Sequence, residues 1–138
     1  MDSVIPSETN PFGYPETIWR LFQETPRAGG FPPDTEGVVT GEAGSHASRA
    51  VLRLQLRFDE KGRVADARFR AYGCPSTIAV GAWIAGWCLG KTAFTLSGLQ
   101  SADLRQTLEI SYDRAHCAMV GEDALRAALD RYSGEQKT

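Results

Sequence analysis

The sequence holds few of the residues from which metal and redox sites are built. Only three of its 138 residues are cysteine, and only two are histidine. An odd number of cysteines cannot form the fully paired disulfide framework of a small secreted domain. The two cysteines and one histidine that could share a site, Cys74, Cys117 and His116, also fall short of the four ligands that a structural tetrahedral zinc site requires. The sequence therefore favours an open metal site or thiol chemistry.

Long apolar runs and an excess of one charge are absent too. The longest apolar stretch, Ile78 to Leu89, is far shorter than the ~20 residues that span a bilayer. The net charge of −2 lacks the basic excess that is typical of nucleic-acid binders. Residues Met1 to Asn10 have neither the basic cluster nor the apolar core of a secretory signal. We expect a soluble cytoplasmic protein that binds neither membranes nor nucleic acid.

The motifs of enzymatic turnover are missing as well. Two adjacent glycines occur in Gly29–Pro33, but the prolines that follow indicate a turn and not a phosphate-binding loop. The sequence contains no nucleophile elbow with a Ser, His and Asp in order. Glu122 and Asp123 suit a solvated first helical turn, where they complement the helix dipole. We therefore predict that the protein is not an enzyme.

The length and the 42% of hydrophobic residues suit one domain with one core. Residues 1–25 are predicted to form an N-terminal arm that carries a short helix at Glu16 to Gln23. Residues 26–138 are predicted to form the single domain.

Three strands are predicted in the first half of that domain. In Ala50 to Phe58 apolar and polar residues alternate strictly, which is the pattern of a half-buried strand. Asp59 to Gly62 is a hairpin turn, and Val64 to Tyr72 is the returning strand. Gly37 to Ala43 is a weaker strand candidate. On the returning strand, one face is predicted to carry Ala65, Ala67, Phe69 and Ala71.

Helices are predicted to follow the strands. The first lies between Pro75 and Gly90, which suit its two ends, and its Gly81 and Gly86 indicate close packing. The others are Ala102 to Glu109, capped by Ser101, and His116 to Tyr132, with Met119, Leu125 and Leu129 facing inward. Strands followed by helices indicate an α+β fold, with helices on one face of a small three-stranded antiparallel sheet.

Cys74, His116 and Cys117 form the candidate site. Cys74 lies at or beside the N-cap of a predicted helix, where free amide groups and the helix dipole favour a thiolate. Cys117 opens the last helix and is expected to gain the same advantage, and His116 adds an imidazole that suits iron or zinc. Cys88 lies ~21 Å from Cys74 along the same helix, so it is predicted to be a buried structural thiol.

Three segments of the chain resemble the IscU/NifU N-terminal family of iron–sulfur cluster assembly scaffolds. They are Ala71 to Ala79 around Cys74, Gly90-Lys91-Thr92, and His116 to Leu125. The cysteine, the Gly-Lys pair and the His-Cys pair all fall in the family's order, and the resemblance covers roughly residues 26–132.

The resemblance implies a small antiparallel sheet packed against helices. It also implies that a cysteine desulfurase supplies sulfur and that a [2Fe-2S] cluster or iron is held for transfer to iron–sulfur acceptor proteins. By resemblance, Cys74 and Cys117 match the second and third scaffold cysteines, and His116 matches the neighbouring histidine.

The chain departs from the family at three places. Ser48 stands at the position of the first cysteine and Ala50 at that of an aspartate, with His46 nearby as a possible substitute ligand. The chaperone-recognition stretch is replaced by Ile110 to Arg114, so the resemblance does not extend to chaperone binding.

Two functions therefore remain open at this point. One is a scaffold that binds iron or a labile cluster through Cys74, His116 and Cys117. The other is an interaction or regulatory module of a cysteine desulfurase that builds no cluster and accepts sulfur as a persulfide on Cys117. A zinc ion held by the same three residues is a third possibility.

Overall fold

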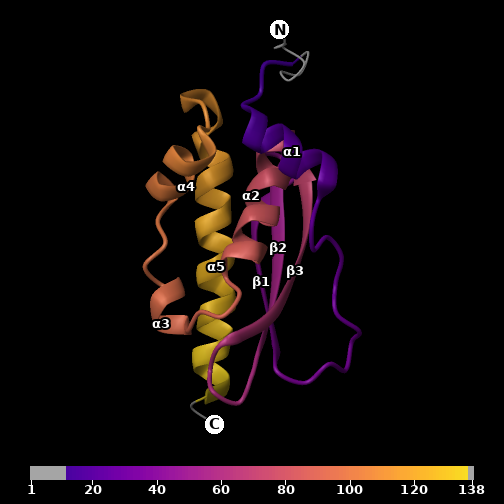
Figure 1. Ribbon diagram of the computed structural model, residues 1–138, viewed down its shortest axis with the longest axis vertical. Coiled ribbons are helices and arrows are strands. Elements are labelled where there is room, and N and C mark those ends of the chain that lie inside the picture. Colours follow the sequence, from indigo (N-terminus) through magenta and orange to yellow (C-terminus); the bar gives the residue numbers. More distant parts are fainter. Residues whose placement is uncertain (1–11, 137–138) are drawn as a thin grey trace, which may run out of the picture.

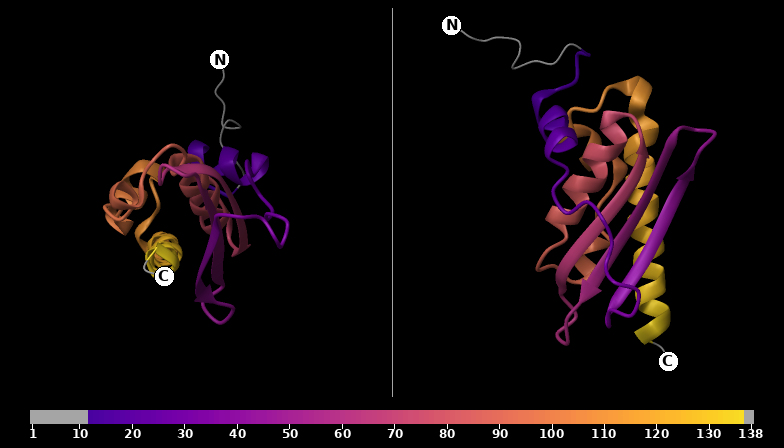
Figure 2. Two further views of the ribbon diagram at one scale, coloured as in Figure 1. Left: turned by 90° about the horizontal axis from the view of Figure 1, so that it is seen from below. Right: turned by 90° about the vertical axis from the view of Figure 1, so that its right-hand side faces the viewer.

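The structure, a computed structural model of the chain, describes residues 12–136. A three-stranded antiparallel sheet in the order β1-β2-β3 is built from β1 (Val38–Ser45), β2 (Ala50–Phe58) and β3 (Val64–Gly73). The α-helices are α1 (Glu16–Glu24), α2 (Pro75–Trp87), α3 (Ala93–Leu96), α4 (Ser101–Leu108) and α5 (Ala115–Gln136), and a 3₁₀ turn, η2 (Tyr112–Arg114), precedes α5. Helices α2 and α5 run along one face of the sheet (Figures 1 and 2). The predicted α+β fold is confirmed.

Strand β2 is the centre of the sheet and of the core. Leu52, Leu54 and Leu56 are fully buried under α2 and α5, while the residues between them face away from these helices. This is the outcome that the strict alternation predicts, because successive side chains of a strand point to opposite faces. Helix α1 packs on α2 and buries Ile18, although the division of the chain at residue 26 stays a prediction.

One strand departs from simple alternation. Phe58 pairs with Val64, but Arg57 pairs with Asp66, so Ala65 is an extra residue in β3. Val64 and Ala67 are both buried as a result, and Ala65 is exposed. The prediction that Ala65 shares the inner face with Ala67 is therefore wrong, because a β-bulge shifts the phase of the strand by one residue.

Two details of the later helices also differ from prediction. Helix α4 is capped by Gln100 and Asp103, whose side chains exchange hydrogen bonds with backbone amides, and not by Ser101. Met119 is 55% exposed, whereas Leu125 and Leu129 are buried as predicted. The inner face of α5 follows the positions of Ala118, Leu125 and Ala128, so Met119 points away from it. Within residues 12–136, no helix is long and apolar enough to cross a bilayer.

The two glycines of α2 play different parts. A Cβ atom at Gly81 would lie 2.6 Å from Phe69 Cδ2 and 2.7 Å from Leu52 Cδ1, so the helix needs glycine there to reach the sheet. A Cβ atom at Gly86 would have no neighbour within 4 Å. Close packing as the reason for glycine is thus confirmed at Gly81 and wrong at Gly86.

These two positions form a matched pair for a stability measurement. Gly81→Ala is expected to lower the free energy of unfolding by about 1–3 kcal/mol, because it overpacks the core. Gly86→Ala is expected to raise it by about 0.5–1 kcal/mol, because alanine is the better helix former. Urea denaturation of both variants checks this, and equal effects of the two substitutions would contradict the packing described.

Candidate thiol and metal site

The two cysteines of the candidate site lie on different elements that meet at one end of the sheet. Cys74 is the N-cap residue between β3 and α2, and Cys117 lies in the first turn of α5. Their sulfur atoms are 3.7 Å apart, and His116 Nε2 lies 3.8 Å from the sulfur of Cys117. The structure therefore brings Cys74, Cys117 and His116 together across 43 residues of sequence.

The backbone before α2 fixes the position of Cys74. Gly73 has φ +144°, and a Cβ atom there would lie 2.5 Å from the carbonyl oxygen of Arg49. Only glycine suits this combination of backbone angle and close contact. The carbonyl of Cys74 then accepts hydrogen bonds from the amides of Thr77 (3.0 Å) and Ile78 (3.2 Å), which begin the helix.

The two thiols hold one proton between them. A hydrogen bond from Cys117 is the main cause that lowers the pKa of Cys74 to about 4, helped by the Thr77 and Ser76 amides against the opposing effect of burial. The pKa of Cys117 is raised, first by its hydrogen bond to Cys74 and then by burial. At neutral pH Cys74 is therefore a thiolate, and Cys117 keeps the proton that it donates to Cys74.

The expectation that Cys117 also has a lowered pKa is wrong. Cys117 is 0% exposed, whereas Cys74 is half-buried. Two thiolates at this separation would repel each other, so the more accessible sulfur ionises and the buried one stays neutral. Cys88 is buried as predicted, and burial raises its pKa to about 12.

Three further residues of the site were not singled out from the sequence. Thr77 Oγ1 donates a hydrogen bond to the sulfur of Cys117 at 3.2 Å. Arg114 and Tyr14 both interact electrostatically with Cys74, and the Arg114 guanidinium lies 4.7 Å from the centre of the Tyr14 ring. Burial, and then the negative charge of Cys74, raise the pKa of Tyr14. Only Thr77 carried a local signal, since it lies three residues after an N-cap.

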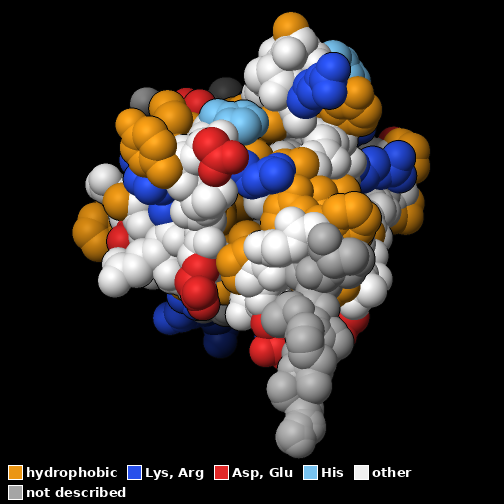
Figure 3. Space-filling model, turned by 90° about the horizontal axis from the view of Figure 1, so that it is seen from above, with side chains coloured by type: hydrophobic (Ala, Val, Ile, Leu, Met, Phe, Trp, Pro, Cys, Tyr) orange, Lys and Arg blue, Asp and Glu red, His pale blue; other side chains and the backbone are white. Residues whose placement is uncertain are grey.

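A solvent-accessible cavity of about 630 Å³ opens onto Cys74 at this end of the molecule, where histidine and arginine or lysine side chains surround a hollow (Figure 3). It is lined by Ser48, Arg49, Tyr72, Gly73, Cys74, Asp113, Arg114 and His116.

The positions at which the family resemblance expects further ligands have different surroundings. Ser48 lines the cavity beside Cys74. Ala50 is 0% exposed and belongs to the core. His46 packs its ring against Tyr72, with 4.8 Å between the ring centres, and does not line the cavity.

In the part of the chain that the structure describes, no three His, Cys, Asp or Glu side chains are arranged to hold a metal ion. Thiol ligands bind metals as thiolates, so Cys117 must first release the proton that it shares with Cys74. Metal binding to this pair is therefore coupled to the loss of that proton.

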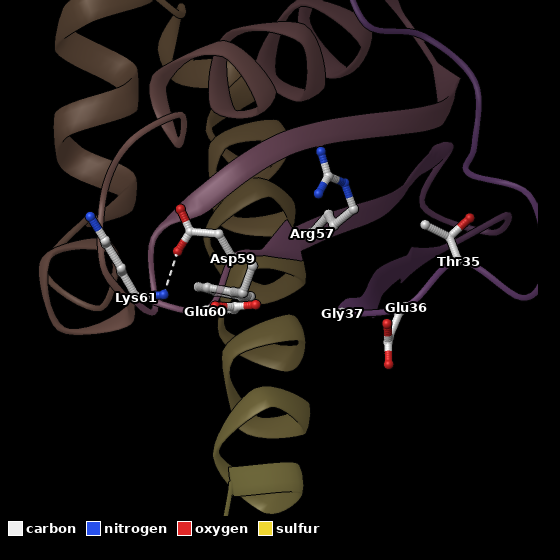
Figure 4. A pocket seen from close by; sticks show the side chains of 8 residues that line it. Thr35, Glu36, Gly37, Arg57, Asp59, Glu60 and Lys61 are labelled. Carbon is white, nitrogen blue, oxygen red and sulfur yellow. Dashed lines mark hydrogen bonds between the residues drawn. The ribbon is translucent and has the colours of Figure 1, made fainter.

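A larger cavity, of about 960 Å³, lies at the β2–β3 hairpin (Figure 4). Its lining residues include neither cysteine nor histidine. The Asp59 carboxylate is occupied there by the amides of Lys61 (2.8 Å) and Arg63 (3.0 Å), which it holds in the turn. The charged side chains fan outward in Figure 4, so this cavity offers no convergent chemistry.

The difference between the three thiols predicts a selective alkylation pattern. Because the pKa of Cys74 is about 4, its thiolate fraction is complete well below neutral pH. Its reaction rate with iodoacetamide is expected to stay flat from about pH 6 to about pH 8. Cys88 and Cys117 are expected to remain unlabelled in the folded protein. Peptide mass spectrometry checks this, and a Cys74 rate that rises about tenfold per pH unit would contradict it.

Comparison with known proteins finds relatives that match most of this chain. Residues 13–138 match the NifU-like N terminal domain family. The iron-sulfur cluster assembly scaffold protein IscU of Escherichia coli strain K12 is 30% identical over 124 residues, which cover 90% of this chain and 97% of that protein. The iron-sulfur cluster assembly enzyme IscU of Drosophila melanogaster is 32% identical over 124 residues, covering 90% of this chain and 80% of that protein.

A solved structure has the same fold. The N-terminal part of a nitrogen-fixing NifU-like protein from Brucella abortus superposes with a TM-score of 0.58 at 17% identity, and 99% of each chain is covered. The family match spans nearly the whole chain, and the fold agrees. The chain therefore belongs to the NifU-like N terminal domain family, as its three segments around Cys74, Lys91 and Cys117 predict.

Proposed function

We propose that this protein is a scaffold for iron–sulfur cluster assembly that holds iron or a labile [2Fe-2S] cluster as its cargo on Cys74, Cys117 and His116. The observation that carries the proposal is the 3.7 Å separation of the two sulfurs beside an open cavity. Relatives named as iron-sulfur cluster assembly proteins support it. Cysteine desulfurase as the sulfur donor and iron–sulfur proteins as acceptors follow from the same role.

The donor set matches this cargo. Thiolates favour soft metals and iron–sulfur clusters, and imidazole suits iron and zinc. The Arg114 guanidinium beside Cys74 offsets the negative charge that thiolate ligands bring to the site. Zinc held by these three residues and one water would have the open coordination of a catalytic-type site, so zinc binding by purified protein is compatible with the proposal.

The set is also incomplete in a way that suits transfer. Ser48 supplies a hydroxyl where the resemblance expects a cysteine, and Ala50 supplies no ligand. An external thiol or a second copy of the chain has to complete the coordination. Iron or a cluster that has only part of its ligands from the protein dissociates easily, which favours transfer over storage.

Reconstitution under anaerobic conditions with ferrous iron and sulfide tests the ligand assignment. Wild-type protein is expected to gain visible absorbance and acid-labile sulfide. Cys74→Ala and Cys117→Ala are each expected to lose more than about nine-tenths of both signals, because each removes a thiolate ligand.

His116→Ala is expected to shorten the lifetime of the bound cargo. Cys88→Ala is the matched control, since Cys88 is a buried cysteine that does not belong to the Cys74–Cys117 pair, and it is expected to keep the wild-type signal. Unchanged absorbance in Cys74→Ala and Cys117→Ala would refute the assignment.

A second candidate function is sulfur acceptance without cluster assembly, in an interaction or regulatory module of a cysteine desulfurase. The buried, protonated state of Cys117 favours Cys74, and not Cys117, as the acceptor. The Cys74 thiolate would attack the terminal sulfur of the desulfurase persulfide. A new S–S bond forms on Cys74, the S–S bond of the donor breaks, and the donor cysteine leaves as a thiolate. The exchange requires no external electrons.

Incubation with a cysteine desulfurase and cysteine distinguishes the two cysteines. Mass spectrometry is expected to place the added sulfur on Cys74 in the wild type and in Cys117→Ala, and to find none in Cys74→Ala. Sulfur on Cys117 in the wild type would contradict this order. Sulfur on Cys74 together with failed cluster reconstitution would favour the second function over the first.

A further inference from the structure

We infer that Thr77 is a positioning residue, whose buried hydroxyl holds the sulfur of Cys117 beside that of Cys74. The inference deepens the proposed function, on which its biological meaning rests. Thr77 is 1% exposed, and its Oγ1 lies 3.2 Å from the sulfur of Cys117 and 3.8 Å from that of Cys74. One hydroxyl thus contacts both sulfurs.

The hydroxyl connects two helices that otherwise carry the sulfurs separately. Thr77 and Cys74 belong to the start of α2, whereas Cys117 belongs to α5. A hydroxyl has a single proton to donate, and Thr77 gives it to Cys117. With that contact made, the thiol proton of Cys117 is free to point to Cys74. The hydrogen bond therefore sets the relative position of two side chains that no backbone segment links directly.

Thr77 is itself held in place on several sides. Its amide donates to the carbonyl of Cys74 at 3.0 Å. The close approach of the Gly73 backbone leaves little space beside it, since a Cβ atom at Gly73 would lie 3.0 Å from Thr77 Oγ1. A β-branched side chain also has few alternative rotamers within a helix. The donor is thus fixed before anything binds.

Burial alone does not explain the contact. The neighbouring Ser76 is also 1% exposed, yet its hydroxyl has no hydrogen-bond partner among the described residues. Two adjacent buried hydroxyls therefore differ in one respect, which is that only Thr77 reaches the sulfurs. Ser76→Ala is for this reason a matched control for the loss of a buried hydroxyl.

If the two sulfurs are already held together in the free protein, a ligand that bonds to both of them binds more tightly. Fixing the pair in the free protein reduces the side-chain freedom that is lost on binding. Removal of the Thr77 hydroxyl is expected to loosen Cys117 and to weaken two-sulfur binding, while single-sulfur chemistry at Cys74 continues.

Phenylarsine oxide, a trivalent arsenical, tests this without iron, sulfide or a desulfurase. Its arsenic bonds to two thiols and releases one water, so tight binding reports a pair of sulfurs within reach of one atom. Thr77→Val, which removes the hydroxyl and keeps the shape, is expected to bind the arsenical about threefold to tenfold more weakly than wild type, the value of one hydrogen bond. Thr77→Ser and Ser76→Ala are expected to stay within about twofold of wild type.

Thermal unfolding of each variant separates this effect from a loss of fold, and Thr77→Ala replaces Thr77→Val in the assay if the latter does not fold. Wild-type affinity in a folded Thr77→Val protein would overturn the inference. So would an equal loss of affinity in Thr77→Ser or in Ser76→Ala. Failure here leaves the proposed scaffold function standing, whereas failed cluster reconstitution would leave the role of Thr77 intact.

Discussion

The contact between the sulfurs of Cys74 and Cys117 is the interaction on which the chemistry of this protein depends. The two sulfurs lie 3.7 Å apart, and their hydrogen bond lowers the pKa of Cys74 and raises that of the buried Cys117, so Cys74 is the sulfur that ionises first. That asymmetry assigns them different roles. In the proposed function, Cys74 would meet incoming iron or sulfur, and Cys117 would become a ligand only after its proton leaves.

The contact itself depends on how closely α5 and α2 approach each other. Cys117 lies one turn before Gly121, where a Cβ atom would come within 2.4 Å of Val80 on α2. Gly81 permits a similar approach of α2 to the sheet. These small residues let two helices and a strand end converge, which is a packing requirement and not a chemical one. The chemical properties of the two sulfurs are then adjusted by the side chains beside them, which are Thr77, Arg114 and Tyr14.

Much of the fold was predictable because its signals are local. Period-two alternation marks β2, and Pro75 marks the start of α2, since both depend only on neighbouring residues. The sequence-based predictions were wrong where an extra residue shifts the alternation of a strand, or where packing against distant residues sets the orientation of a side chain. A bulge at Ala65 shifts the inner face of β3, and the rotation of α5 turns Met119 outward. The free space beside Gly86 and the raised pKa of Cys117 also depend on residues that are distant in the sequence.

Local patterns in the sequence indicate the order of the strands and of the main helices, the inner face of β2 and the family, and they lead to Cys74, His116 and Cys117 as the proposed site. Those follow from local patterns and from motifs that keep their spacing. Which of the two sulfurs ionises depends on the folded structure, because a neighbour 43 residues away and burial set the two pKa values. The same holds for Arg114 and Tyr14, which join the site from segments that carry no motif. Proton sharing acts over a few ångströms in space, and no pattern along the chain encodes that distance.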